Sequence, residues 1–65
     1  MNDQVRIEPK GGKYAVVLLH GGLSQEMDVR DTYSDAEDFA FYVARRVKLD
    51  IYFAGKKLGR RRETK

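Results

Sequence analysis

A pair of glycines, Gly21 and Gly22, limits the possible folds of this chain more than any other feature. They separate two stretches, residues 13–20 and 23–30, that both read as strands: the first is rich in valine and leucine, and the second alternates between apolar and polar residues. A two-residue hairpin turn needs positive φ angles at its central residues, which glycine adopts at no steric cost. The sequence therefore predicts a β-hairpin with Gly21-Gly22 as its turn.

The turn also predicts how the two strands of this hairpin are aligned. Side chains that lie opposite each other across the strands share one face of a sheet. We expect the core face to carry the pairs His20 and Leu23, Leu18 and Gln25, Val16 and Met27, and Tyr14 and Val29. The other face then carries an apolar group beside polar residues: Ala15, Val17 and Leu19 next to Ser24, Glu26 and Asp28.

A helix is predicted after the hairpin. Ser34 and Glu37 have the spacing of a capping box, in which the serine caps the helix and the glutamate reaches back to its first residue. Acidic residues gather near the predicted start and basic residues near the end, which suits the helix dipole. At 3.6 residues per turn, the apolar stripe contains Ala36, Ala40, Val43 and Val47, flanked by Phe39, Phe41 and Ala44.

The remaining segments complete a small α+β domain. Val5 and Ile7 indicate a short strand that ends at Pro9, and residues 49–54 indicate another strand. Leu58 either starts a last short strand or packs back onto the domain. We expect one domain over residues 1–58, a basic tail over 59–65, and the order β-β-β-α-β. The sheet is expected to be mainly antiparallel, with three to four strands and the helix on one face.

Length and composition restrict what can stabilise this domain. A chain of 65 residues has a small core, and it contains no cysteine and only one histidine, His20. Disulfides are thus excluded, and a zinc site of the usual His/Cys type is not expected. We predict no cofactor and no metal, and a homodimer is one way to gain stability. No signal peptide or membrane span is visible, so we expect a cytoplasmic protein without a membrane partner.

The string His20-Gly21-Gly22 is also typical of the oxyanion-hole loop of esterases. That loop works only with a nucleophile and a base, and the chain has no Gly-x-Ser-x-Gly motif and no second histidine. The hairpin explains both glycines without further parts, so we expect that the protein is not an enzyme.

Charge is distributed very unevenly along the chain. Residues 1–38 have a net charge of −4, whereas residues 39–65 have a net charge of +7. A dense basic segment favours contact with nucleic acid, although basic tails also serve only to keep small domains soluble. The first functional hypothesis is therefore a non-enzymatic nucleic-acid-binding protein. Tyr42 and Tyr52 could stack on a base or against a guanidinium. The expected contact residues are Arg45, Arg46, Lys56, Lys57, Arg60, Arg61 and Arg62.

The alternative hypothesis is a protein-binding inhibitor or adaptor of the antitoxin or phage anti-defence kind. An acidic row can mimic phosphates, and the apolar residues beside it could meet another sheet. Long lysine and arginine side chains, or the N-terminal strand, could equally cover those apolar residues. The expected interface residues are Ala15, Val17, Leu19, Glu26 and Asp28.

Three short motifs carry a family resemblance: Gly-Gly-Lys-Tyr-Ala-Val at 11–16, Asp-Thr-x-Ser-Asp-Ala-Glu at 31–37 and Gly-x-x-x-Gly-Arg at 55–60. On these motifs the chain resembles a family of small bacterial proteins of unknown function with a β-β-α-β core. The segment that enters the helix is also similar to that of HicB-type antitoxins, whose sheet-plus-helix domains bind a toxin. This second resemblance implies a protein partner, and neither family implies an active site.

Overall fold

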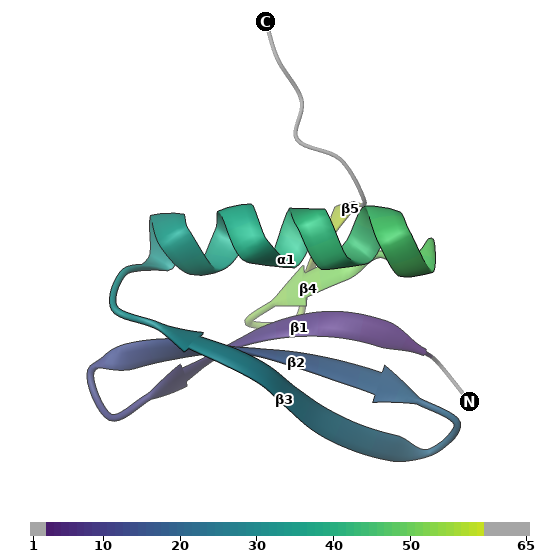
Figure 1. Ribbon diagram of the computed structural model, residues 1–65, viewed down its shortest axis with the longest axis horizontal. Helices are drawn as coiled ribbons and strands as arrows, with labels where there is room; N and C mark the ends of the chain where they lie inside the picture. The colour runs from purple at the N-terminus through teal and green to yellow at the C-terminus, as the bar shows by residue number, and fades with distance from the viewer. Residues whose placement is uncertain (1–2, 60–65) are drawn as a thin grey trace, which may run out of the picture.

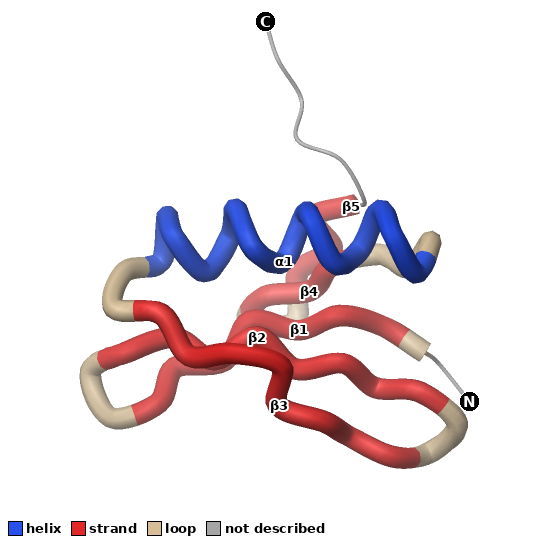
Figure 2. Tube along the Cα trace, in the orientation of Figure 1, coloured by secondary structure: helices blue, strands red, loops and turns tan. Residues whose placement is uncertain are grey.

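A five-stranded sheet with one helix across a single face forms the domain (Figures 1 and 2). The computed structural model describes residues 3–59 of the chain. The strand order across the sheet is β3-β2-β1-β4-β5. Along the chain, the elements are β1 (Gln4–Lys10), β2 (Lys13–His20), β3 (Leu23–Arg30), α1 (Tyr33–Val47), β4 (Ile51–Phe53) and β5 (Lys56–Gly59).

The α+β class and the single helix are confirmed, but the predicted strand count and order were wrong. The order is β-β-β-α-β-β, and the sheet is mixed because β4 lies parallel to β1 while all other neighbours are antiparallel. β5 has four residues and one large apolar side chain, Leu58, so it shows no alternation that a sequence could reveal. Main-chain pairing with β4 makes it a strand. The tail expected over 59–65 lies, apart from Gly59, outside the described residues.

The register of the β2–β3 hairpin is confirmed near its turn and wrong further away. His20 pairs with Leu23 and Leu18 with Gln25, as predicted, but the register shifts between Val17 and Val16. Met27 is the extra residue of this β-bulge, so Val16 faces Asp28 and Tyr14 faces Arg30. The shift brings Arg30 to the helix side, where its guanidinium lies 4.8 Å from the centre of the Phe39 ring. Val29 consequently moves to the other face beside Ala15.

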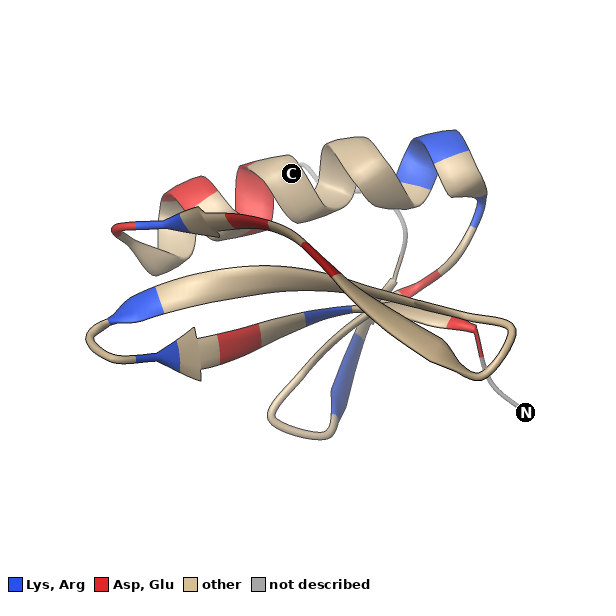
Figure 3. Ribbon diagram, turned by 60° about the horizontal axis from the view of Figure 1, so that its bottom comes forward, with Lys and Arg blue, Asp and Glu red and all other residues tan. Residues whose placement is uncertain are grey.

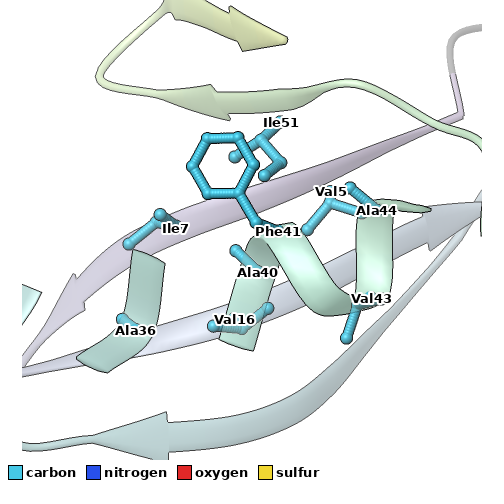
Figure 4. Close-up of a cluster of buried hydrophobic side chains, with 9 residues drawn as sticks. All are labelled: Val5, Ile7, Val16, Ala36, Ala40, Phe41, Val43, Ala44 and Ile51. Carbon is cyan, nitrogen blue, oxygen red and sulfur yellow. The ribbon is translucent and has the colours of Figure 1, made fainter. Parts of the chain in front are cut away.

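The core lies between α1 and the sheet. The alanines on the inner face of the helix, Ala36, Ala40 and Ala44, are fully buried and let the helix lie close to the strands (Figure 4). Val47 was predicted to be part of the same stripe but is 40% exposed, because it is the last residue of the helix and lies at the rim of the core. The buried cluster contains Val5, Ile7, Val16, Ala36, Ala40, Phe41, Val43, Ala44 and Ile51.

The cap of the helix differs from the prediction. Thr32, not Ser34, is the N-cap, and its side-chain oxygen accepts a hydrogen bond of 3.1 Å from the main-chain N–H of Asp35. Threonine caps helices nearly as well as serine. The earlier start makes Tyr33 helical and places its ring 5.7 Å from that of Tyr14 and 4.8 Å from that of Phe53. Aromatic packing with the sheet thus selects the earlier cap.

The first and fourth strands also differ in length from their predicted bounds. β1 continues through Pro9 to Lys10, although Pro9 was expected to end it. Within β1, only Val5–Ile7 pair with β4, so Pro9 has a neighbouring strand, β2, on one side only. On its other side no strand is present, so the missing N–H of proline breaks no hydrogen bond between strands. β4 itself is short because the chain turns at Ala54 and Gly55.

Candidate functional site

The two edges of the sheet carry charge of opposite sign. β3, at one edge, carries Glu26 and Asp28, and β5, at the other, carries Lys56 and Lys57. The helix has the same polarity, with acidic residues in its first half and Arg45 and Arg46 in its last turn (Figure 3). The charge asymmetry of the sequence therefore becomes an asymmetry in space.

The basic residues of the first three strands are all engaged with carboxylates. The distances from nitrogen to oxygen are 3.3 Å for Arg6 and Glu8, 2.6 Å for Lys10 and Glu26, 3.2 Å for Lys13 and Asp31, and 2.7 Å for Arg30 and Asp28. A phosphate that approached these cations would also meet the neighbouring carboxylates. This part of the molecule is therefore a poor site for a polyanion.

Among residues 39–59, most basic side chains form no ion pair with a described carboxylate. Lys57 lies 3.4 Å from Asp50, and the Arg46 guanidinium lies 5.6 Å from the centre of the Tyr42 ring. Within residues 3–59, neither Arg45 nor Lys56 forms an ion pair, and both are exposed. These cations keep their charge available to a partner.

The structure places the predicted nucleic-acid contacts in two groups. Arg45 and Arg46 are exposed in the last turn of α1, and Lys56 and Lys57 are exposed on the β4–β5 hairpin. Figure 3 shows the end of the helix and this hairpin apart from each other. Gly59 pairs with Ile51, so the chain leaves the described part close to the loop that follows α1. The other three contacts, Arg60, Arg61 and Arg62, lie outside the described residues.

The sheet face away from α1, the open face, brings Tyr52 next to a basic residue that the sequence did not suggest. Tyr52 pairs with Arg6 of β1 on one side and with Lys57 of β5 on the other. Partners in register point to the same face, so the tyrosine lies between two cations. The alternation of β1 places Arg6 opposite Val5 and Ile7, but only the parallel pairing with β4 reveals its neighbour.

The apolar residues predicted as a protein interface lie on this open face and are largely covered. Ala15 is 2% exposed and Val17 is 9% exposed, while Leu19 is half-buried. The ion pair between Lys10 of β1 and Glu26 of β3 spans β2 on their side. Ala15 and Val17 thus offer little surface to a partner, whereas Leu19 stays partly exposed. Of the two acidic residues of the predicted interface, Glu26 pairs with Val17 on the open face, as expected. Asp28 was wrongly placed there: the bulge pairs it with Val16, on the helix side of the sheet. Both form the ion pairs given above.

His20 is at the end of β2 beside the Gly21-Gly22 turn. Its Nδ1 lies 3.2 Å from Oδ2 of Asp3, whose other carboxylate oxygen accepts a 3.1 Å hydrogen bond from the main-chain N–H of Gly21. Asp3 thus ties the N-terminal segment to the turn, and the imidazole is mostly exposed. In the part of the chain that the structure describes, no group of three His, Asp or Glu side chains is placed to hold a metal ion.

Comparisons with protein-family models, curated proteins and solved structures find no match to this chain. The resemblances to the small bacterial family and to HicB-type antitoxins thus stay predictions. Between residues 3 and 59, no helix has the length and apolar character needed to cross a bilayer.

Proposed function

We propose that the protein is a non-enzymatic nucleic-acid-binding protein that uses its basic C-terminal part. The observation that carries this proposal is the difference in pairing: the cations of β1–β3 are matched by carboxylates, whereas Arg45 and Lys56 have none within residues 3–59. The proposed contact residues, called the basic surface below, are Arg45, Arg46, Lys56, Lys57, Arg60, Arg61 and Arg62.

The physical basis is the release of counterions. Each cation that neutralises a phosphate frees a condensed ion, so affinity falls steeply as the salt concentration rises. Charge density alone is sufficient for this term, and no recognition helix is required. Such contacts position a protein on the phosphate backbone without reading the base sequence.

The test is a titration of the purified protein with random-sequence duplex DNA and with single-stranded RNA at two salt concentrations. We expect micromolar or tighter binding that weakens strongly at the higher salt concentration. A chain that ends at Gly59 lacks three arginines of the basic surface, and we expect it to bind much more weakly while it stays folded. Absence of binding by the full chain at low salt would contradict the proposal.

A second candidate function is binding to a protein, as an inhibitor or adaptor, and the outer edge of β3 favours it. β3 pairs with β2 on one side only, and two large apolar side chains are exposed on it, Leu23 at 76% and Met27 at 38%. Light scattering distinguishes self-association from a monomer, and a pull-down detects another partner. Truncation at Gly59 would leave this activity intact, whereas it weakens nucleic-acid binding.

A further inference from the structure

A hollow of about 350 Å³ opens on the open face between β1 and the turn of the β4–β5 hairpin. It forms because β4 ends at Phe53 and the chain turns away at Ala54 and Gly55, while β1 continues to Lys10 without a neighbour on that side. Small-molecule sites usually have volumes from about 300 Å³ upward. The hollow is thus large enough for one planar ring system, and its walls include Gln4, Arg6, Glu8, Tyr52, Ala54 and Gly55.

Tyr52 is the aromatic wall of this hollow. Tyr14 and Tyr33 pack against each other, and Tyr42 lies near Arg46 and Phe39. Within residues 3–59, by contrast, the Tyr52 ring contacts no other ring and no guanidinium, and its hydroxyl forms no hydrogen bond. Of the two tyrosines expected to stack on a base or a guanidinium, Tyr42 thus meets a guanidinium, whereas Tyr52 offers a free ring beside a cavity.

The floor of the hollow supplies both hydrogen-bond donors and acceptors. The Arg6 guanidinium donates from Nε to Oε1 of Gln4 at 3.2 Å and from Nη1 to Oε2 of Glu8 at 3.3 Å. These contacts join exposed side chains of one strand, so they exchange readily with other partners. A guanidinium beside a carboxylate and an amide presents the donor and acceptor pattern that the edge of a nucleobase requires.

We propose that this hollow binds one unpaired base of a single-stranded nucleic acid, stacked on Tyr52, with its edge facing Arg6 and Glu8. The inference rests on the proposed function and specifies its ligand. Lys57, next to Tyr52 in register on the open face, is placed to meet a flanking phosphate. Bases of a duplex are stacked and paired inside the helix, so a duplex cannot fill the hollow.

The experiment compares Tyr52→Leu with the unchanged protein, using a single-stranded oligonucleotide and a blunt duplex of the same sequence at one salt concentration. Leucine keeps an apolar side chain but removes the ring. Since stacking contributes about 1–3 kcal/mol per base, we expect single-strand affinity to fall roughly 5- to 150-fold. Duplex affinity should not change. Tyr52→Phe retains the ring and should bind as the unchanged protein does.

Leu23→Ala is the control, because Leu23 is exposed and lies on β3, at the opposite edge of the sheet from the β4–β5 hairpin. We expect it to leave single-strand affinity unchanged. Circular dichroism of each variant confirms that it is folded. Amide NMR spectra recorded with the oligonucleotide should show shifts at Arg6, Tyr52 and Gly55.

The outcomes separate this inference from the proposed function. If single strand and duplex are bound equally and Tyr52→Leu changes neither affinity, the basic surface works without the hollow and the inference is wrong. Equal losses for Leu23→Ala and Tyr52→Leu would also contradict it. If the unchanged protein binds neither nucleic acid, the proposed function fails, and the inference fails with it.

Discussion

Two parts of the sheet differ in how they are built and in what their charges do. The meander β1–β3 consists of strands of seven, eight and eight residues, whereas the hairpin β4–β5 consists of strands of three and four. In the meander every basic side chain has a carboxylate partner; on the hairpin Lys57 has one and Lys56 has none within residues 3–59. Basic side chains are therefore all in ion pairs in the meander, whereas Lys56 of the hairpin has no carboxylate partner among the described residues.

This difference in ion pairing shows that the number of basic residues in a segment is a poor guide to a binding surface. Arg6, Lys10 and Lys13 make the early chain look partly basic, but each lies within 3.3 Å of a carboxylate oxygen. Such exposed pairs contribute little stability, at most about 1 kcal/mol each. Their effect is to cancel the positive electrostatic potential around these cations, so the unpaired positive charge lies in the C-terminal part.

The largest expected effect concerns how the short hairpin is held. Ile51 is fully buried and pairs with Val5, so we expect Ile51→Ala to lower the free energy of unfolding by about 2–5 kcal/mol, from lost burial and the cavity. Leu23→Ala in the exposed end of the meander should change it by less than about 0.5 kcal/mol. Urea unfolding measures both. Equal losses would mean that the hairpin is not anchored by Ile51.

The next prediction tests the contrast in charge directly. The double variant Arg45→Gln/Lys56→Gln removes two unpaired cations, and we expect about a tenfold loss of nucleic-acid affinity, with a salt dependence reduced by about two ions. The matched double variant Lys10→Gln/Lys13→Gln removes the same amount of charge from two paired cations outside the basic surface, so we expect it to have a much smaller effect. Filter binding over a salt series provides the measurement. Equal losses would end the distinction between paired and unpaired cations.

A smaller effect is expected at the start of α1, the helix that connects the meander to the hairpin. Thr32 caps the helix through its contact with the N–H of Asp35, so Thr32→Ala should lower the free energy of unfolding by about 1 kcal/mol. Ser34→Ala, which removes a hydroxyl from the adjacent turn, should have little effect. Thermal unfolding of the two variants provides the measurement. A larger loss of stability for Ser34→Ala than for Thr32→Ala would mean that Ser34 is the N-cap.

The smallest expected effects compare the turns of the two parts. Gly21 has a φ of +60° in the meander, and Ala54 has a φ of +52° at the corresponding place in the hairpin, where a Cβ atom is unfavourable. We expect Ala54→Gly to stabilise the protein by about 0.5–1 kcal/mol and Gly21→Ala to destabilise it by about 1 kcal/mol. A Cβ atom at Gly21 would meet nothing within 4 Å, so the loss would report backbone strain alone. Changes of the same sign would contradict this account.

Much of the meander and the helix can be predicted from the sequence because their signals are local. The Gly21-Gly22 turn, the pairing of His20 with Leu23 and the buried alanine face of α1 are all confirmed. Periodicity and turn chemistry depend only on residues close together in the chain. The charge asymmetry between the two halves is equally visible without a structure.

Some features depend on contacts between residues far apart in sequence, because the local sequence allows more than one arrangement. Thr32 and Ser34 are both competent caps, and the packing of Tyr33 against Tyr14 and Phe53 selects the first. The bulge at Met27 turns Arg30 to the helix side, where its guanidinium lies over the Phe39 ring, a residue on another element. The hollow beside Tyr52 depends on a parallel pairing between residues 6 and 52 that no local pattern encodes. Most of the elements and the sign of their charge follow from neighbours along the chain and could be predicted, whereas β5, which depends on its pairing with β4, could not. Only the tertiary structure determined which cations are paired and where a cavity opens, because both depend on contacts between segments far apart in sequence.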